Sequence, residues 1–103
     1  MSALLLVACG TSKPTVPALN PEQATTLLRY NNRAVNWMVF VHRNNPACEY
    51  KLDLPDQSAH PAQLDLDHIV SCGGRPAPKE FDASVSFAYD TAQQKWVLTR
   101  FSS

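Results

Sequence analysis

Residues 35–43, VNWMVFVHR, determine which of two α+β folds the chain adopts. Six of the first seven are β-branched, aromatic or methionine. Because β-branched residues are crowded in a helix and pack well on a pleated sheet, we expect a central strand covered on both faces. The alternative is that these residues extend the preceding helix to Asn44.

The two interpretations predict different α+β folds. A strand at 35–43 gives one short N-terminal helix packed on an antiparallel sheet or small sandwich of about five strands. A helix there gives a longer helix over 21–44, followed by a four-stranded antiparallel sheet.

A helix from 21 to about 31 is predicted to precede this stretch. Asn20 is a good cap, Pro21 suits the first helical position, and Glu22 places an acid in the first turn. Asn31 and Asn32 weaken the helix after three turns.

Alternating apolar and polar residues predict the strands that follow. They are expected over 48–54, 64–72, 83–89 and 96–101, with loops at 55–63 and 73–80 and a hairpin connection at 90–94. We expect Trp37, Trp96 and Phe101 to lie in the core. His68 should share the apolar face of the second of these strands and be half-buried, with one ring nitrogen satisfied, whereas Asp65 and Asp67 should be solvated.

Length and charge limit the function classes. The chain has 103 residues, which is one domain at most. Nine Lys and Arg balance nine Asp and Glu, and no basic stripe is present, so a nucleic-acid partner is not expected. No apolar run approaches the ~18–20 residues that span a bilayer.

The N-terminus carries a processing pattern. An apolar run from Ala3 to Ala8 ends at Cys9, and the last four residues read LVAC. This pattern resembles the lipobox of bacterial lipoproteins, in which the cysteine thiol takes a diacylglyceryl group before cleavage. The resemblance implies that Cys9 is acylated, with palmitate among its acyl chains. The residue after the cysteine is Gly10 and not Asp, which resembles the lipoproteins that are sorted to the outer membrane. A Lys- or Arg-bearing segment is expected before residue 1, because no charged n-region precedes the run.

The resemblance divides the chain into three parts. Residues 1–9 would be a truncated lipoprotein signal segment ending in lipidated Cys9. Residues 10–20, GTSKPTVPALN, would be a flexible tether reaching roughly 30–35 Å. Residues 21–103 would be a single globular domain on the periplasmic face of the outer membrane.

Two cysteines remain once Cys9 is assigned to lipid. Cys48 and Cys72 both fall on the apolar faces of predicted strands, so we expect a disulfide between them in an oxidising periplasm. Two free buried thiols are the alternative. No metal site is expected, since neither cysteine belongs to a Cys-x-x-Cys pair.

Catalytic motifs are not apparent, and no enzyme activity or cofactor is expected. The segment GGRPAPK is the best partner-binding loop, because it combines flexible, rigid and charged residues: Gly73, Gly74, Arg75, Pro76, Pro78 and Lys79. We therefore expect a protein-binding or structural accessory component of an envelope assembly such as a secretion or pilus system. The alternatives are an inhibitor or immunity lipoprotein directed against a hydrolase or phage, and a small enzyme or ligand carrier using a pocket of ~300 Å³ at Asp65, Asp67 or His68.

Overall fold

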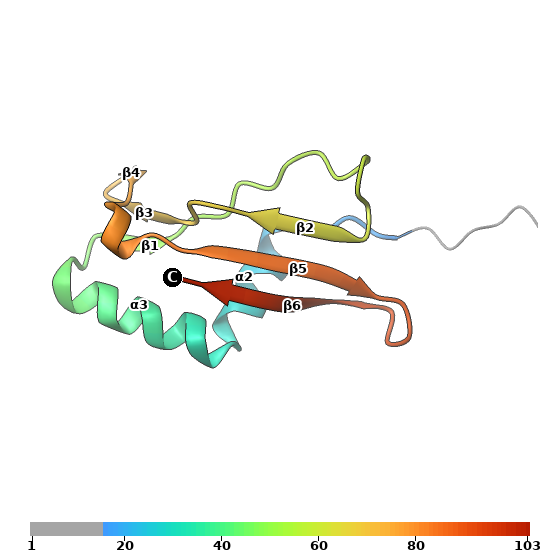
Figure 1. Ribbon diagram of the computed structural model, residues 1–103, viewed down its shortest axis with the longest axis horizontal. Helices are drawn as coiled ribbons and strands as arrows, with labels where there is room; N and C mark the ends of the chain where they lie inside the picture. The colour runs from blue at the N-terminus through green and yellow to red at the C-terminus, as the bar shows by residue number, and fades with distance from the viewer. Residues whose placement is uncertain (1–15) are drawn as a thin grey trace, which may run out of the picture.

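The computed structural model describes residues 16–103 and has an α+β fold, as the sequence predicts. Two helices come first, followed by six short strands and one 3-10 turn (Figure 1). In chain order the elements are α2 Pro21–Arg29, α3 Asn32–Asn44, β1 Cys48–Tyr50, β2 Gln63–Leu66, β3 Val70–Cys72, β4 Arg75–Pro76, η1 Lys79–Phe81, β5 Ser84–Asp90 and β6 Lys95–Ser102.

The strand expected at 35–43 is wrong, and the helical alternative is correct in kind. Residues 35–43 lie within α3, which is separated from α2 at Tyr30 and Asn31 rather than continuous with it. Asn31 explains both the break between the two helices and the start of α3. Its side chain caps α3 by accepting a hydrogen bond from the Ala34 N–H at 3.0 Å. Ala34 and Val41, seven residues apart, then point into the core on one side of the helix.

The first helix begins where the sequence predicts. Asn20 accepts from the Gln23 N–H at 2.8 Å, and the Gln23 side chain accepts from the Asn20 N–H at 3.2 Å. This reciprocal capping box fixes the start of α2 at Pro21.

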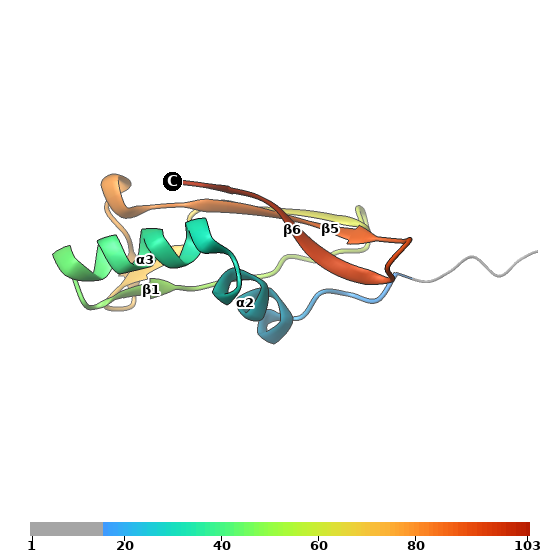
Figure 2. The same ribbon diagram turned by 90° about the horizontal axis from the view of Figure 1, so that it is seen from below.

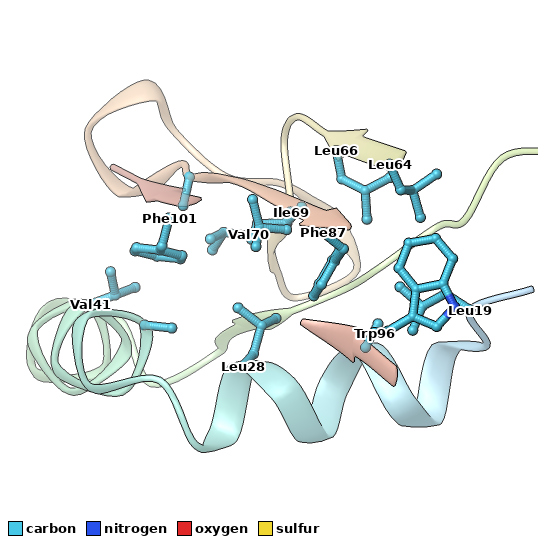
Figure 3. Packing of buried hydrophobic residues seen from close by; sticks show 14 of the residues in the cluster. Leu19, Leu28, Val41, Leu64, Leu66, Ile69, Val70, Phe87, Trp96 and Phe101 are labelled. Carbon is cyan, nitrogen blue, oxygen red and sulfur yellow. The ribbon is translucent and has the colours of Figure 1, made fainter. Parts of the chain in front are cut away.

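The strands form two three-stranded antiparallel sheets, ordered β1-β3-β4 and β2-β5-β6. In Figure 2, β5 and β6 run along one side of the domain, and β1 and α2 lie on the opposite side. The apolar core fills the space between these layers (Figure 3). The Tyr50 hydroxyl links β1 to α3 by donating to the Ala34 carbonyl at 2.6 Å. Burial raises the pKa of the Tyr50 hydroxyl.

The packed part of the chain reaches back into the predicted tether. Leu19 is 1% exposed and belongs to the core (Figure 3). Its N–H and carbonyl both hydrogen-bond the side chain of Gln57, at 2.9 and 2.8 Å, and the Trp96 indole donates to the Pro17 carbonyl at 2.8 Å. Residues 16–20 are therefore part of the domain, and only residues 10–15 of the predicted tether lie outside the described residues.

The continuous strand expected at 64–72 is also wrong. The chain leaves one sheet after Leu66 and enters the other at Val70, and His68 makes the bend with φ of 56°. The Ile69 N–H donates to the Ala83 carbonyl at 3.1 Å, and the Lys51 N–H donates to the Ile69 carbonyl at 2.7 Å. His68 consequently points to solvent, with its side chain 81% exposed, and not to the core as expected.

Other expectations hold with adjusted bounds. Strand 48–54 shortens to β1, although Leu52 and Leu54 still pack against the core. Trp96 and Phe101 are buried as expected, and Trp37 is half-buried. Neither helix among residues 16–103 is long and apolar enough to cross a membrane.

Candidate functional site

The predicted disulfide is present. Cys48 and Cys72 lie directly opposite each other in the register of β1 and β3, and their sulfurs are bonded at 2.06 Å. The Cys48 carbonyl also hydrogen-bonds Nε2 of His42 at 2.5 Å, which connects α3 to β1. The other predicted modification site, Cys9, lies outside the described residues.

The predicted partner-binding loop is a tight hairpin followed by a turn. Gly73 and Gly74 form a two-residue connection between β3 and β4, with φ of 61° and 80°. Positive φ at both positions is what such a hairpin requires, so glycine suits each one. Arg75 and Pro76 belong to β4, and Lys79 begins η1, so this segment is not the plain loop that the sequence suggests.

The hairpin is anchored at its base and charged on its outside. Cys72 immediately precedes it, and the Gly73 N–H donates to the Ala47 carbonyl at 3.1 Å. Arg75 and Lys79 are exposed, and neither forms an ion pair with any residue from 16 to 103. A hairpin whose backbone is held in this way can present cationic side chains to a partner with little ordering of the main chain.

His68 and Asp82 form an ion pair on the surface. Nδ1 of His68 lies 2.5 Å from Oδ2 of Asp82, and the other Asp82 oxygen accepts from the Ala83 N–H at 2.8 Å. The hydrogen bond with Asp82 raises the pKa of His68, with Coulombic attraction from Asp82 and then Asp67 adding to it. The expected satisfied nitrogen is therefore present, but on an exposed histidine.

This ion pair borders an open hollow of about 440 Å³, whose lining includes Lys79, Ser84 and Ser102. A second hollow of about 360 Å³ is lined by His60, Asp65 and five other residues. Both volumes are above the minimum of ~300 Å³ expected of a ligand-carrying pocket. Within the described part of the chain, however, no hydroxyl hydrogen-bonds Nε2 of His68, so a nucleophile activated by this histidine is not assembled there.

Residues 16–103 contain no group of three His, Cys, Asp or Glu side chains placed to hold an ion. Asp65 and Asp67 are exposed, as expected of a solvated strand face.

Sequence reasoning missed an apolar surface on the helices. Tyr30, Val35, Val39 and Phe40 are exposed, by 86%, 40%, 47% and 46%. We call these four residues the helical patch. A helical period over residues 35–43, which is the alternative interpretation of this stretch, separates Val35 and Val39 from buried Val41.

The helical patch has neighbours on both sides of α3. Val35 and Val39 line a groove of about 510 Å³ together with Arg29, His42 and residues of α2 and β1. On the other side Phe40 stacks on Trp37, with ring centroids 5.1 Å apart, and the Trp37 indole donates to the Phe81 carbonyl at 3.3 Å. These contacts hold the apolar side chains in place on the surface.

Comparisons of the chain with protein-family models, curated proteins and solved structures give no match. Function is therefore inferred from the residues and their geometry.

Proposed function

We propose that this protein is a non-enzymatic lipoprotein, anchored through acylated Cys9 to the periplasmic face of the outer membrane. There it would bind a protein as an accessory component of an envelope assembly such as a secretion or pilus system. The observation that carries the proposal is the Cys48–Cys72 disulfide, taken together with the lipobox-like residues 6–9.

The disulfide supports an exported chain because such bonds persist in oxidising compartments and are rare in the cytosol. Cys48 is fully buried and its partner is half-buried. With these two cysteines bonded to each other, Cys9 is the one thiol of the three that remains for acylation.

A binding role is supported by the kind of surface that the domain offers. The segment from Gly73 to Lys79 is held at its start by the hydrogen bond from Gly73 to Ala47, and its Arg75 and Lys79 form no ion pair within residues 16–103. The hollow near His68 is open, and no assembled nucleophile accompanies the His68–Asp82 pair in the described residues. We therefore favour the hairpin as the contact with a protein partner.

Intact-mass analysis of protein purified from the native envelope tests the anchor. We expect a chain that begins at Cys9 and carries acyl groups, found in the outer-membrane fraction. Cys9→Ser should abolish the modification and the acyl-dependent part of the outer-membrane fractionation, whereas Cys48→Ala/Cys72→Ala should retain the modification. An uncleaved chain with an unmodified Cys9 would overturn the proposal.

Pull-down of the lipidated protein, with and without Arg75→Glu/Lys79→Glu, tests the binding surface. Retention of an envelope-assembly component by the native protein and its loss from the charge-reversed variant are expected. Unchanged capture by the variant would exclude the hairpin as the contact.

An inhibitor or immunity lipoprotein is the second candidate, and the same hairpin favours it. A short, preorganised, cationic projection suits insertion into the active-site cleft of one soluble hydrolase. This function predicts tight binding to a purified enzyme and inhibition that Arg75→Glu/Lys79→Glu weakens. Recovery of envelope components without any hydrolase would count against it.

A further inference from the structure

The exposed large apolar side chains of the described residues are gathered in one place. All four members of the helical patch lie between residues 30 and 40, at the α2–α3 junction and along α3. Figures 1 and 2 show α3 along one long side of the domain, with its outer side uncovered. A patch confined to α3 and the residue that ends α2 marks an interaction surface, whereas scattered apolar residues would not.

Charge is segregated onto the same segment of the chain. Residues 23–48 contain Arg29, Arg33 and Arg43 but no Asp or Glu, so this segment has a formal charge of +3. Since the whole chain is neutral, the remaining residues carry −3. The three arginines are exposed, and none forms an ion pair with another residue of the range 16–103.

We infer that the helical patch and its flanking arginines dock on an anionic phospholipid bilayer. Aromatic and aliphatic side chains on a helix that carries arginines and no acid are the combination that binds the interface of an anionic membrane. Glu49 of β1 is the one acid among the residues that line the groove beside Val35 and Val39, and Arg29 and His42 line the same groove. Tyr30 and Phe40 would enter the headgroup region, while Arg33 and Arg43 would pair with lipid phosphates.

The length of chain before the domain favours a membrane over a soluble partner. Packing starts by Val16, seven residues after Cys9, and seven extended residues span about 25 Å at most. This step rests on the proposed acylation of Cys9, which would hold the domain close to the bilayer. The docking itself requires no acyl chain, because the side chains supply the apolar and charged contacts.

Vesicle binding by the full chain with Cys9→Ser tests docking separately from acylation. Vesicles of phosphatidylglycerol and phosphatidylcholine at 3:7 are compared with pure phosphatidylcholine vesicles, by co-sedimentation at low and at high salt. We expect binding to the anionic vesicles that high salt weakens, and little binding to the neutral ones.

Matched charge variants locate the contact. Arg33→Gln/Arg43→Gln should weaken binding to anionic vesicles by at least tenfold, since each arginine near an anionic surface contributes roughly fivefold. Arg75→Gln/Lys79→Gln removes the same charge elsewhere and should change binding less than twofold. Tyr30→Ala/Phe40→Ala should also weaken binding, with circular dichroism confirming that each variant is folded.

Three results would overturn the inference. They are no binding to either kind of vesicle, an equal loss of vesicle binding in the two charge variants, and unchanged binding in Tyr30→Ala/Phe40→Ala. The first would leave the helical patch to a protein partner. Failure of the proposed function can be distinguished from failure of this inference, because the two are measured separately. Intact-mass analysis of the native protein tests acylation of Cys9, and its result does not alter vesicle binding by the Cys9→Ser chain.

Discussion

Individual residues hold the chain where it changes direction most sharply. His68 and Gln94 adopt positive φ without being glycine, and Gly73 and Gly74 do so at the hairpin. The left-handed region costs an L-residue roughly 1–2 kcal/mol, so such positions need support from surrounding contacts. Asp82 and the backbone hydrogen bond from Ile69 provide it at His68.

The ion pair at His68 predicts a specific titration. Asp82→Asn should lower the pKa of His68 toward its ordinary value of about 6.5, because the main cause of its elevation is removed. Asp67→Asn is the matched control and should lower it less, since Asp67 contributes the weakest of the attractive effects. Following the His68 ring protons by NMR across pH 5–9 measures both, and equal shifts in the two variants would contradict the assignment.

The same pair sets the sign of a pH dependence in stability. A histidine whose pKa is raised by folding stabilises the protein fully below its unfolded value, and the contribution is lost as pH rises through the folded value. The native protein should therefore be more stable than Asp82→Asn near pH 6, with the difference disappearing at alkaline pH. Denaturant melts at both pH values measure it, and a difference that grows with pH would refute the sign.

Gly74 provides the third residue-scale prediction. With φ of 80°, Gly74→Ala should lower the free energy of unfolding by about 1 kcal/mol, although a methyl group there meets no atom within 4 Å. Gly74→Asn should cost clearly less, because asparagine tolerates this backbone conformation. Urea unfolding of the two variants separates backbone strain from steric overlap, and equal costs would exclude strain.

At the scale of elements, α3 shows where sequence patterns are ambiguous. Residues 35–43 carry apolar side chains at spacings that fit both the period of a strand and the period of a helix. Val35, Val39 and Val41 would share one face of a strand, but their spacing is also compatible with a helix. The Asn31 cap and the burial of Ala34 resolve the ambiguity, and both depend on contacts outside the stretch. By contrast, α2 and the β5–β6 hairpin could be predicted, since their caps, alternation and turn residues are local.

A pair of valine variants tests the helical register directly. Val41→Ala should lower the free energy of unfolding by about 2 kcal/mol, because Val41 is fully buried. Val39→Ala should change it by less than about 0.5 kcal/mol, since Val39 is nearly half exposed and alanine favours helix. A strand would place both valines on one face, so similar losses in denaturant melts would contradict α3.

At the scale of the whole molecule, the features that could not be predicted are those that join distant segments. The Leu19 backbone is held by Gln57, 38 residues away, and this contact converts the end of a proline-rich tether into part of the core. The crossing between sheets at His68 likewise depends on Ala83. The disulfide could be predicted because alternation placed both cysteines on buried faces, whereas the helical patch could not, because it appears only once α3 is a helix.

The final prediction concerns the disulfide, which links the neighbouring strands β1 and β3. Cys48→Ala/Cys72→Ala opens a loop whose ends are 24 residues apart, which should lower the free energy of unfolding by about 3–4 kcal/mol on the chain-entropy account. Domains of this size have roughly 5–15 kcal/mol in total, so the variant should fold but melt at markedly lower temperature. Cys9→Ser is the control and should leave the melting temperature unchanged, since Cys48 and Cys72 bond each other. Calorimetry with and without reductant measures the effect, and a reductant-insensitive native protein that melts like the double variant would show that the bond does not form.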